Sequence, residues 1–92
     1  MKGTEKQIAW AEDIIKNARV TVAANIAKNE EEAEKHEGSS AAAYYREQAD
    51  KWTRLGEQIE GFFAATDDAA KIIDKRDLFD PRQLCKKWVD RA

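Results

Sequence analysis

The sequence predicts a single all-α domain in which a long antiparallel helical hairpin is closed by two shorter helices, making four helices in all. The 92 residues contain only one proline and four glycines, so long stretches of the chain lack a helix breaker. Apolar residues recur at three- or four-residue spacing, the period of a buried helix face, and strand-like alternation is absent. A chain of this length has room for one core, so residues 1–92 are treated as one domain.

The first helix is expected over residues 4–36. Thr4 and Gln7 have the spacing of a capping box, in which each side chain accepts a hydrogen bond from the backbone amide of the other residue. Gly38 is the first stop signal after this helix. Apolar spacing disappears in residues 29–37, which predicts a solvated or fraying end. The predicted buried stripe comprises Ile8, Ala11, Ile15, Ala18, Val22 and Ile26, with Trp10 and Ile14 widening it.

The second helix is expected over residues 41–65, with Ser39 or Ser40 as its N-cap. The short loop before it predicts an antiparallel pairing with the first helix. Gly56 and Gly61 each weaken a helix by about 1 kcal/mol relative to alanine, so they suggest a close helix contact or a bend. The predicted buried face comprises Tyr45, Gln48 or Ala49, Trp52, Leu55 or Gly56, Ile59, and Phe62 or Phe63, with Trp52 as the principal core residue.

Two shorter helices are expected after the hairpin. The Thr-Asp-Asp sequence at 66–68 offers a cap for a third helix over residues 69–76. An aspartate before Pro81 marks the start of the last helix, because proline is favoured at the first helical position. This helix is expected over residues 81–90. The apolar residues of these two elements are Ile72 or Ile73, then Leu78, Phe79, Leu84, Cys85, Trp88 and Val89.

Composition excludes several classes of protein. Charged residues make up 37% of the chain, yet the net charge is only −2, so neither a strongly basic nor a strongly acidic partner is implied by the whole molecule. Cys85 is the single cysteine, which excludes an internal disulfide and fits a reducing compartment. No apolar run reaches the roughly 20 residues of a membrane span, and the N-terminus lacks the apolar stretch of a signal peptide. A cytoplasmic location without membrane contact is expected.

The residues with catalytic or metal-binding potential have no partners in the sequence. His36 lies one turn after Glu32, but a zinc site needs three or four ligands, and no second histidine or cysteine is nearby. Cys85 falls on the apolar face of the last helix, which favours a buried structural thiol over a nucleophile. Phosphate-binding glycine loops, paired zinc ligands and a nucleophile elbow are missing. We therefore expect a non-enzymatic protein without cofactor or metal.

Protein binding is the leading functional expectation. The acidic run from Glu30 to Glu37 has the charge pattern that imitates phosphates for a basic protein surface, although a solvated helix end neutralised by nearby lysines would look the same. The neighbouring pairs at 44–45 and 62–63 are aromatic, and their members point about 100° apart on a helix. At least one member of each pair is therefore a candidate exposed contact. The candidate protein-binding residues are Glu30, Glu31, Glu34, Tyr44 and Phe62.

An alternative is a small nucleic-acid-binding accessory protein that uses the basic last helix. Basic side chains beside Trp88 would suit single-stranded nucleic acid, whereas interleaved aspartates weaken the field felt by phosphates. Self-association is a further expectation, because a hairpin of about 50 Å, at 1.5 Å per residue, exceeds what two short helices can cover. A homodimer is therefore compatible with the sequence. The candidate nucleic-acid-binding residues are Arg82, Lys86, Lys87 and Arg91.

Two segments carry a resemblance to small uncharacterised helical proteins of bacteria, phages and other mobile elements. Residues 3–14, Gly-Thr-Glu-Lys-Gln-Ile-Ala-Trp-Ala-Glu-Asp-Ile, resemble the opening of such proteins. Residues 70–76 resemble a later segment of them, with Ile72 in place of an aromatic residue. The resemblance implies a mobile-element setting, in which small helical proteins bind and disable host machinery. It makes an anti-CRISPR-like inhibitor of a bacterial defence complex one expectation.

Overall fold

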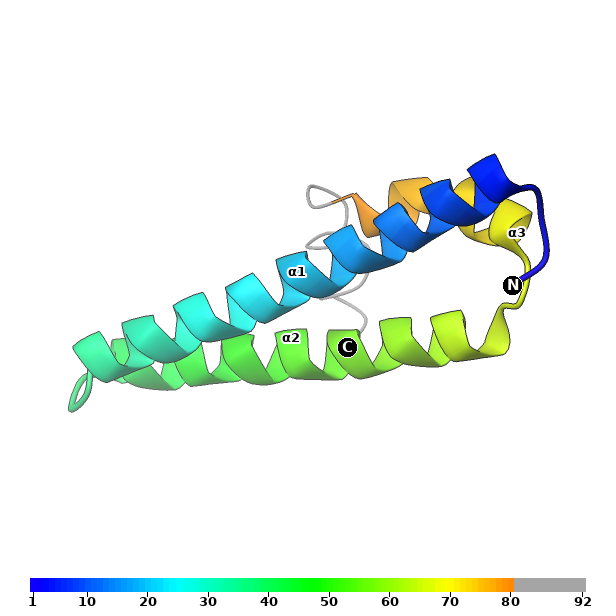
Figure 1. The fold of residues 1–92 in the computed structure, drawn as a ribbon. Coiled ribbons are helices and arrows are strands. Elements are labelled where there is room, and N and C mark those ends of the chain that lie inside the picture. The colour runs from blue at the N-terminus through cyan, green and yellow to red at the C-terminus, as the bar shows by residue number, and fades with distance from the viewer. Residues whose placement is uncertain (81–92) are drawn as a thin grey trace.

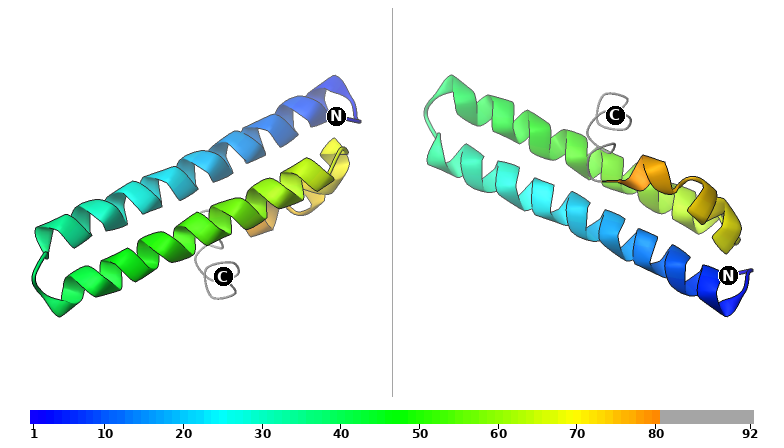
Figure 2. Two further views of the ribbon diagram at one scale, coloured as in Figure 1. Left: turned by 90° about the horizontal axis from the view of Figure 1, so that it is seen from below. Right: turned by 90° about the horizontal axis from the view of Figure 1, so that it is seen from above.

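The computed structural model describes residues 1–80 as an elongated helical hairpin with a small helical cap at its open end (Figure 1). The elements are α1 (Glu5–Lys35), α2 (Ser40–Ala65), α3 (Ala69–Asp74) and a 3-10 helix, η1 (Arg76–Phe79). α1 and α2 run antiparallel along the molecule, whose extents are 53 × 20 × 20 Å. α3 and η1 lie against one face of the hairpin, in front of it in the right-hand view of Figure 2 and behind it in the left-hand view.

The all-α class and the long hairpin are confirmed, whereas the count of four helices is not. Within residues 1–80 there are three α-helices, and the expected last helix at 81–90 lies outside the described residues. The predicted third helix is shorter than expected, because the chain winds more tightly after Asp74. The Lys75 amide donates to the carbonyls of Lys71, Ile72 and Ile73. The Arg76 guanidinium also donates to the carbonyl of Ile73, at 2.9 Å. The tighter 3-10 turn brings Phe79 into the core.

The N-terminus of α1 forms as the sequence predicts. The Gln7 amide donates to the Thr4 hydroxyl at 3.1 Å, and the Thr4 amide donates to the Gln7 side-chain oxygen at 3.0 Å. Trp10, however, is not a core residue, because its side chain is 49% exposed. One residue turns the helix by about 100°, which places Trp10 at the edge of the stripe that buries Ala11. The guanidinium of Arg76 lies 5.4 Å from the indole centroid and partly covers it.

The end of α1 is solvated, which is one of the two outcomes expected for residues 29–37, and it stays helical as far as Lys35. Ala33 is only 3% exposed there, and the Lys35 ammonium pairs with Glu31 at 3.3 Å. Because alanine has little apolar area, the burial of Ala33 is not apparent from the spacing of the large hydrophobic residues. α1 ends at Lys35 with His36 as its C-cap, and Gly38 adopts a φ of +89° in the turn that follows. Ser39 occupies the N-cap position of α2, but its hydroxyl donates to the carbonyl of His36 rather than capping a helix amide.

The core is the seam between α1 and α2. Trp52 is 4% exposed, as expected, and Leu55 is wholly buried. A Cβ on Gly56 would lie 3.1 Å from Val22 Cγ1, so this glycine permits the close helix contact that the sequence suggested. A second apolar cluster, under α3, consists of Ala11, Ala69 and Ile72 with Ile8, Ile14, Ile15 and Phe62 around it. The main cluster consists of Ala18, Val22, Trp52, Leu55, Ile59, Phe63 and Phe79.

The segment before α1 closes the open end of the hairpin. The Lys2 amide donates to the carbonyl of Asp67 at 2.8 Å, and the Ala69 amide donates to the carbonyl of Lys2 at 2.8 Å. Gly3 follows with a φ of +139°, and a Cβ there would lie 3.1 Å from the Cβ of Ala69. The Asp68 side chain accepts from the Ala70 amide and caps α3, as the sequence predicts. The start of α3 is therefore held both by its connection to α2 and by the segment that precedes α1.

We expect Trp52→Ala to lower the free energy of unfolding by about 3 to 5 kcal/mol, because it leaves a large cavity in the seam. Trp10→Ala is the matched control, since the same side chain is removed from a half-exposed site. It should cost no more than about 1 kcal/mol. Urea denaturation followed by circular dichroism measures both values. Equal losses for the two tryptophans would contradict this core.

The two glycines of α2 give a second prediction. Gly61→Ala should stabilise the protein by about 0.5 to 1 kcal/mol, because no atom of the described residues lies within 4 Å of the new Cβ and alanine favours the helix. Gly56→Ala should stabilise the protein less than Gly61→Ala, or destabilise it, because the new Cβ would crowd Val22 Cγ1. Thermal and urea denaturation of the two variants compares them directly. A larger gain at Gly56 than at Gly61 would show that the helices are not in close contact there.

Candidate protein-binding surface

The face of the hairpin opposite α3 and η1 carries a groove between the two long helices. α3 and η1 pack on the side of α1 that presents Ile14 and Asn17. Arg19 and Ala23 point to the other side, because two residues turn a helix by about 200°. The left-hand view of Figure 2 looks onto the hairpin with η1 behind it. This face is therefore free of the other described elements.

The central groove has a volume of about 510 Å³ and an almost wholly apolar lining. Gly56 forms part of its floor, where the absence of a side chain lets Val22 pack against the backbone of α2. Ala23 keeps the facing wall low, and Ile26 is only partly covered. The groove is thus apolar surface that the described fold leaves in contact with solvent. Its residues are Ala18, Arg19, Val22, Ala23 and Ile26 of α1 and Thr53, Gly56, Glu57, Ile59 and Glu60 of α2.

An ion pair joins the two helices across this face. Arg19 Nε lies 2.6 Å from Glu60 Oε1, and Arg19 Nη2 lies 2.8 Å from Glu60 Oε2, which is a bidentate arrangement. The hydrogen bond from Arg19 lowers the pKa of Glu60, and the same bond raises the pKa of Arg19. Both side chains stay about half exposed, so the pair contributes little to stability. Its larger effect is to fix two charges at one end of the central groove.

A second hollow, of about 490 Å³, lies on the other side of this ion pair. It shares Arg19 and Glu60 with the central groove, so the two form one depression along the hairpin. Its walls mix apolar and charged side chains, and Val20 is 59% exposed beside it. The remaining lining residues are Glu12, Ile15, Lys16, Phe63 and Ala64.

The same face becomes acidic towards the tip of the hairpin. Glu30, Glu34 and Glu37 line a third hollow, where Arg46 is the single basic side chain. Glu30 follows Ile26 by about one helical turn, so this tip hollow continues the central groove along α1. Two of the predicted protein-binding residues, Glu30 and Glu34, are therefore brought together beside an apolar groove.

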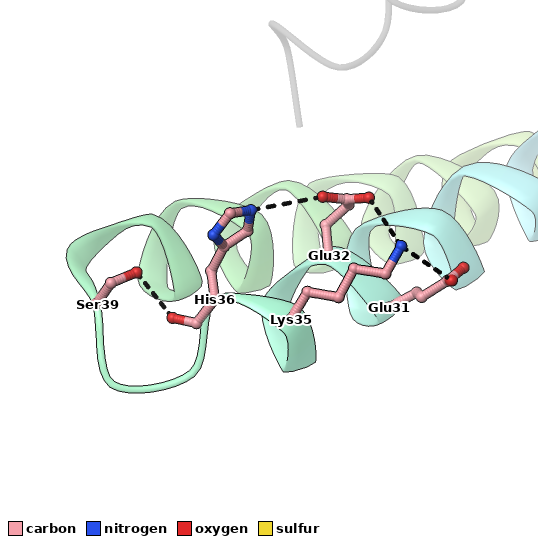
Figure 3. Close-up of polar contacts among 5 residues, drawn as sticks. All are labelled: Glu31, Glu32, Lys35, His36 and Ser39. Atoms are coloured by element: carbon pink, nitrogen blue, oxygen red, sulfur yellow. Dashed lines mark hydrogen bonds and ion pairs between the residues drawn. The ribbon is translucent and has the colours of Figure 1, made fainter.

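Glu31 lies in a different setting at the tip. Its carboxylate pairs with the Lys35 ammonium, which also lies 3.7 Å from Glu32 (Figure 3). The imidazole of His36 approaches Glu32 at 3.6 Å and stacks on Tyr45 with ring centroids 5.5 Å apart. The charge of Glu31 is thus already matched by a neighbour on its own helix.

The two aromatic candidates lie far apart. Tyr44 is 57% exposed at the tip, edge-on to Tyr45. Phe62 follows eighteen residues later on α2, about 27 Å along the helix. It is half buried, with its ring centroid 5.6 Å from that of Phe79, so it supports the packing of η1. The five predicted protein-binding residues do not form one surface.

Other sequence candidates have no further support. Among residues 1–80 no three histidine, cysteine or acidic side chains gather as metal ligands would. None of the described helices combines the length and apolarity needed to cross a membrane. The predicted thiol and the predicted nucleic-acid-binding residues lie outside the described residues. These are Cys85, Arg82, Lys86, Lys87 and Arg91.

No family of known proteins, no curated protein and no solved structure matches this chain. The surface itself is therefore the basis for a functional proposal. The central groove is not visible in the sequence, because its walls come from two helices whose register is set by packing. Gly56 was its one visible signal, because a glycine inside a helix predicted a close contact.

The ion pair predicts a pH-dependent stability difference for Glu60→Gln. Because the pKa of Glu60 is lowered in the folded state, its contribution is present above the ordinary value of 4.5 and is lost as the pH falls through the folded-state pKa. We expect the variant to be less stable by at most about 1 kcal/mol at neutral pH and equal to the wild type in acid. Urea denaturation at a series of pH values measures this difference.

Glu47→Gln is the control, since Glu47 is exposed on α2 and makes no ion pair within residues 1–80. It should show no such pH-dependent difference. A deficit of Glu60→Gln that persists unchanged in acid would mean that the bidentate pair does not form.

Proposed function

We propose that this chain is a non-enzymatic protein-binding module that holds its partner along the central groove. The observation that carries the proposal is the groove itself, an apolar depression on a face that the other described elements leave free. A hollow with an apolar lining and charged residues at its edges is the kind of concave surface at which ligands and partners bind. Because the wall residue Ala23 is small and exposed, the partner's side chains can reach into the groove.

Several features favour a protein over a nucleic acid as the partner of this face. The tip hollow carries three carboxylates against one guanidinium, which repels a phosphate backbone. Arg19, the basic residue of the central groove, is already paired with Glu60. An apolar centre with charged residues at its edge is the usual anatomy of a protein interface.

We further propose that the biological partner belongs to a bacterial complex. The resemblance to proteins of phages and mobile elements makes a bacterial defence or nucleic-acid-processing complex the first assembly to test. Acidic residues beside an apolar groove would suit a basic surface on such a complex. In this proposal the chain acts as an inhibitor by occupying that surface, in the manner of an anti-CRISPR protein.

The test uses Ala23→Arg, which fills the central groove without removing a buried side chain, because Ala23 is exposed. Ala24→Arg is the matched control: the same change on the next residue points about 100° further from the groove. Tagged full-length proteins are incubated with bacterial lysate, and the bound proteins are quantified by mass spectrometry. We expect a partner that wild type and Ala24→Arg retain and Ala23→Arg loses. Retention of every bound protein by Ala23→Arg would refute binding through this groove.

A further inference from the structure

We propose that the element bound in the central groove is a basic amphipathic α-helix of the partner protein, with its basic residues facing the acidic tip of the hairpin. This inference rests on the proposed function and specifies the chemistry of the partner. It follows from three properties of the face, namely the polarity of the groove, its shape and the distribution of charge at its edges.

The polarity of the groove requires an occupant that satisfies its own backbone. The lining is almost wholly apolar, and the helices that form it use their amides and carbonyls internally. An extended peptide laid there would leave its backbone groups without partners, which is costly away from water. Residues 1–80 also contain no sheet to which a strand could be added, since Lys2 and Asp68 form only an isolated bridge. A helix meets the requirement because its hydrogen bonds are internal.

The shape of the groove also suits a helix. Two antiparallel helices present a valley into which a third can pack at the usual interaxial distance of about 8 to 10 Å. From Ala18 to Glu34 the face runs for about 24 Å along α1, which matches a helix of about four turns. Such a helix would present apolar residues at i, i+3, i+4 and i+7 to Val22, Ile26 and Gly56.

The charged residues at the edges of the groove determine which charge the bound helix carries. Arg19 and Glu60 neutralise each other, which leaves Glu57 at the rim of the central groove. Beyond Ile26, the tip hollow adds Glu30, Glu34 and Glu37 against Arg46. Lysine and arginine at the flanks of the bound helix would match this excess of negative charge, whereas glutamates would be repelled. Basic residues on the flanks of the bound helix therefore lie over the tip.

The experiment measures binding of three fluorescent peptides of about 18 residues, roughly five helical turns, to the full-length protein by anisotropy at low ionic strength. The first has a leucine stripe at helical spacing and lysines on its flanks. The second carries glutamates in place of the lysines. The third has the composition of the first in a scrambled order without the stripe. We expect the first peptide to bind at least about tenfold more tightly than either of the others.

Variants locate the bound peptide. Ala23→Arg and Glu34→Lys should each weaken binding of the lysine peptide by about tenfold or more, through steric filling and charge repulsion respectively. Ala24→Arg and Glu47→Lys make the same changes on exposed positions away from the groove, and they should leave binding within about twofold. Circular dichroism confirms that all four variants are folded before the comparison.

The contrary outcomes are distinct. Equal binding of the glutamate peptide, or of the scrambled peptide, would overturn a basic amphipathic helix as the occupant. So would sedimentation showing a dimer that Ala23→Arg dissociates, because the groove would then hold a second copy. If no peptide binds while Ala23→Arg still loses its lysate partner, this inference fails and the proposed function stands. If the peptide binds as expected and no lysate partner depends on Ala23, the groove still prefers a basic helix, but the proposed function fails, and with it the assignment of that helix to a partner protein.

Discussion

The seam between α1 and α2 is the constraint on which the rest of the structure depends. Trp52, Leu55 and Ile59 contribute large buried side chains to it, and Ala18 and Gly56 let the helices come close enough to bury them. The second apolar cluster lies at the open end, under α3, so it cannot compensate for the loss of a large side chain from the seam. The cap also depends on this seam, because Phe79 packs into the same apolar cluster.

The same packing explains how the molecule acquires a binding surface. Two helices in contact bury one stripe each and leave a valley on either side of the contact. α3 and η1 fill one valley near the open end of the hairpin, where Phe62 contacts Phe79. The valley on the other face is uncovered by the described elements, and the bidentate pair of Arg19 with Glu60 crosses it. The groove is thus a consequence of the hairpin's own geometry.

Features encoded by neighbouring residues were predictable from the sequence. The capping box at Thr4, the turn at Gly38 and the burial of Trp52 all follow from local spacing or from helical period. Features set by tertiary packing were not. Trp10 stands one residue away from the buried stripe, so its exposure depends on how α1 is rotated against α2.

The candidate site likewise has features that the sequence shows and features that only tertiary packing sets. The acidic character of the run after residue 29 was visible, but a linear run cannot show which carboxylates share a helix face. Glu30 and Glu34 line the tip hollow, whereas Glu31 pairs with Lys35. The pair of Arg19 with Glu60 joins residues forty-one positions apart, and only the folded chain brings them together.

Native-state hydrogen exchange tests the central claim most directly, because it measures the opening free energy of each helix separately. If the seam holds the hairpin together, the amides of Val22 in α1 and Leu55 in α2 exchange only through global unfolding. Their opening free energies then equal each other and the value from denaturation. Exchange at Val22 through an opening several kcal/mol easier than that at Leu55 would contradict the account, because α1 would then detach while α2 remains folded.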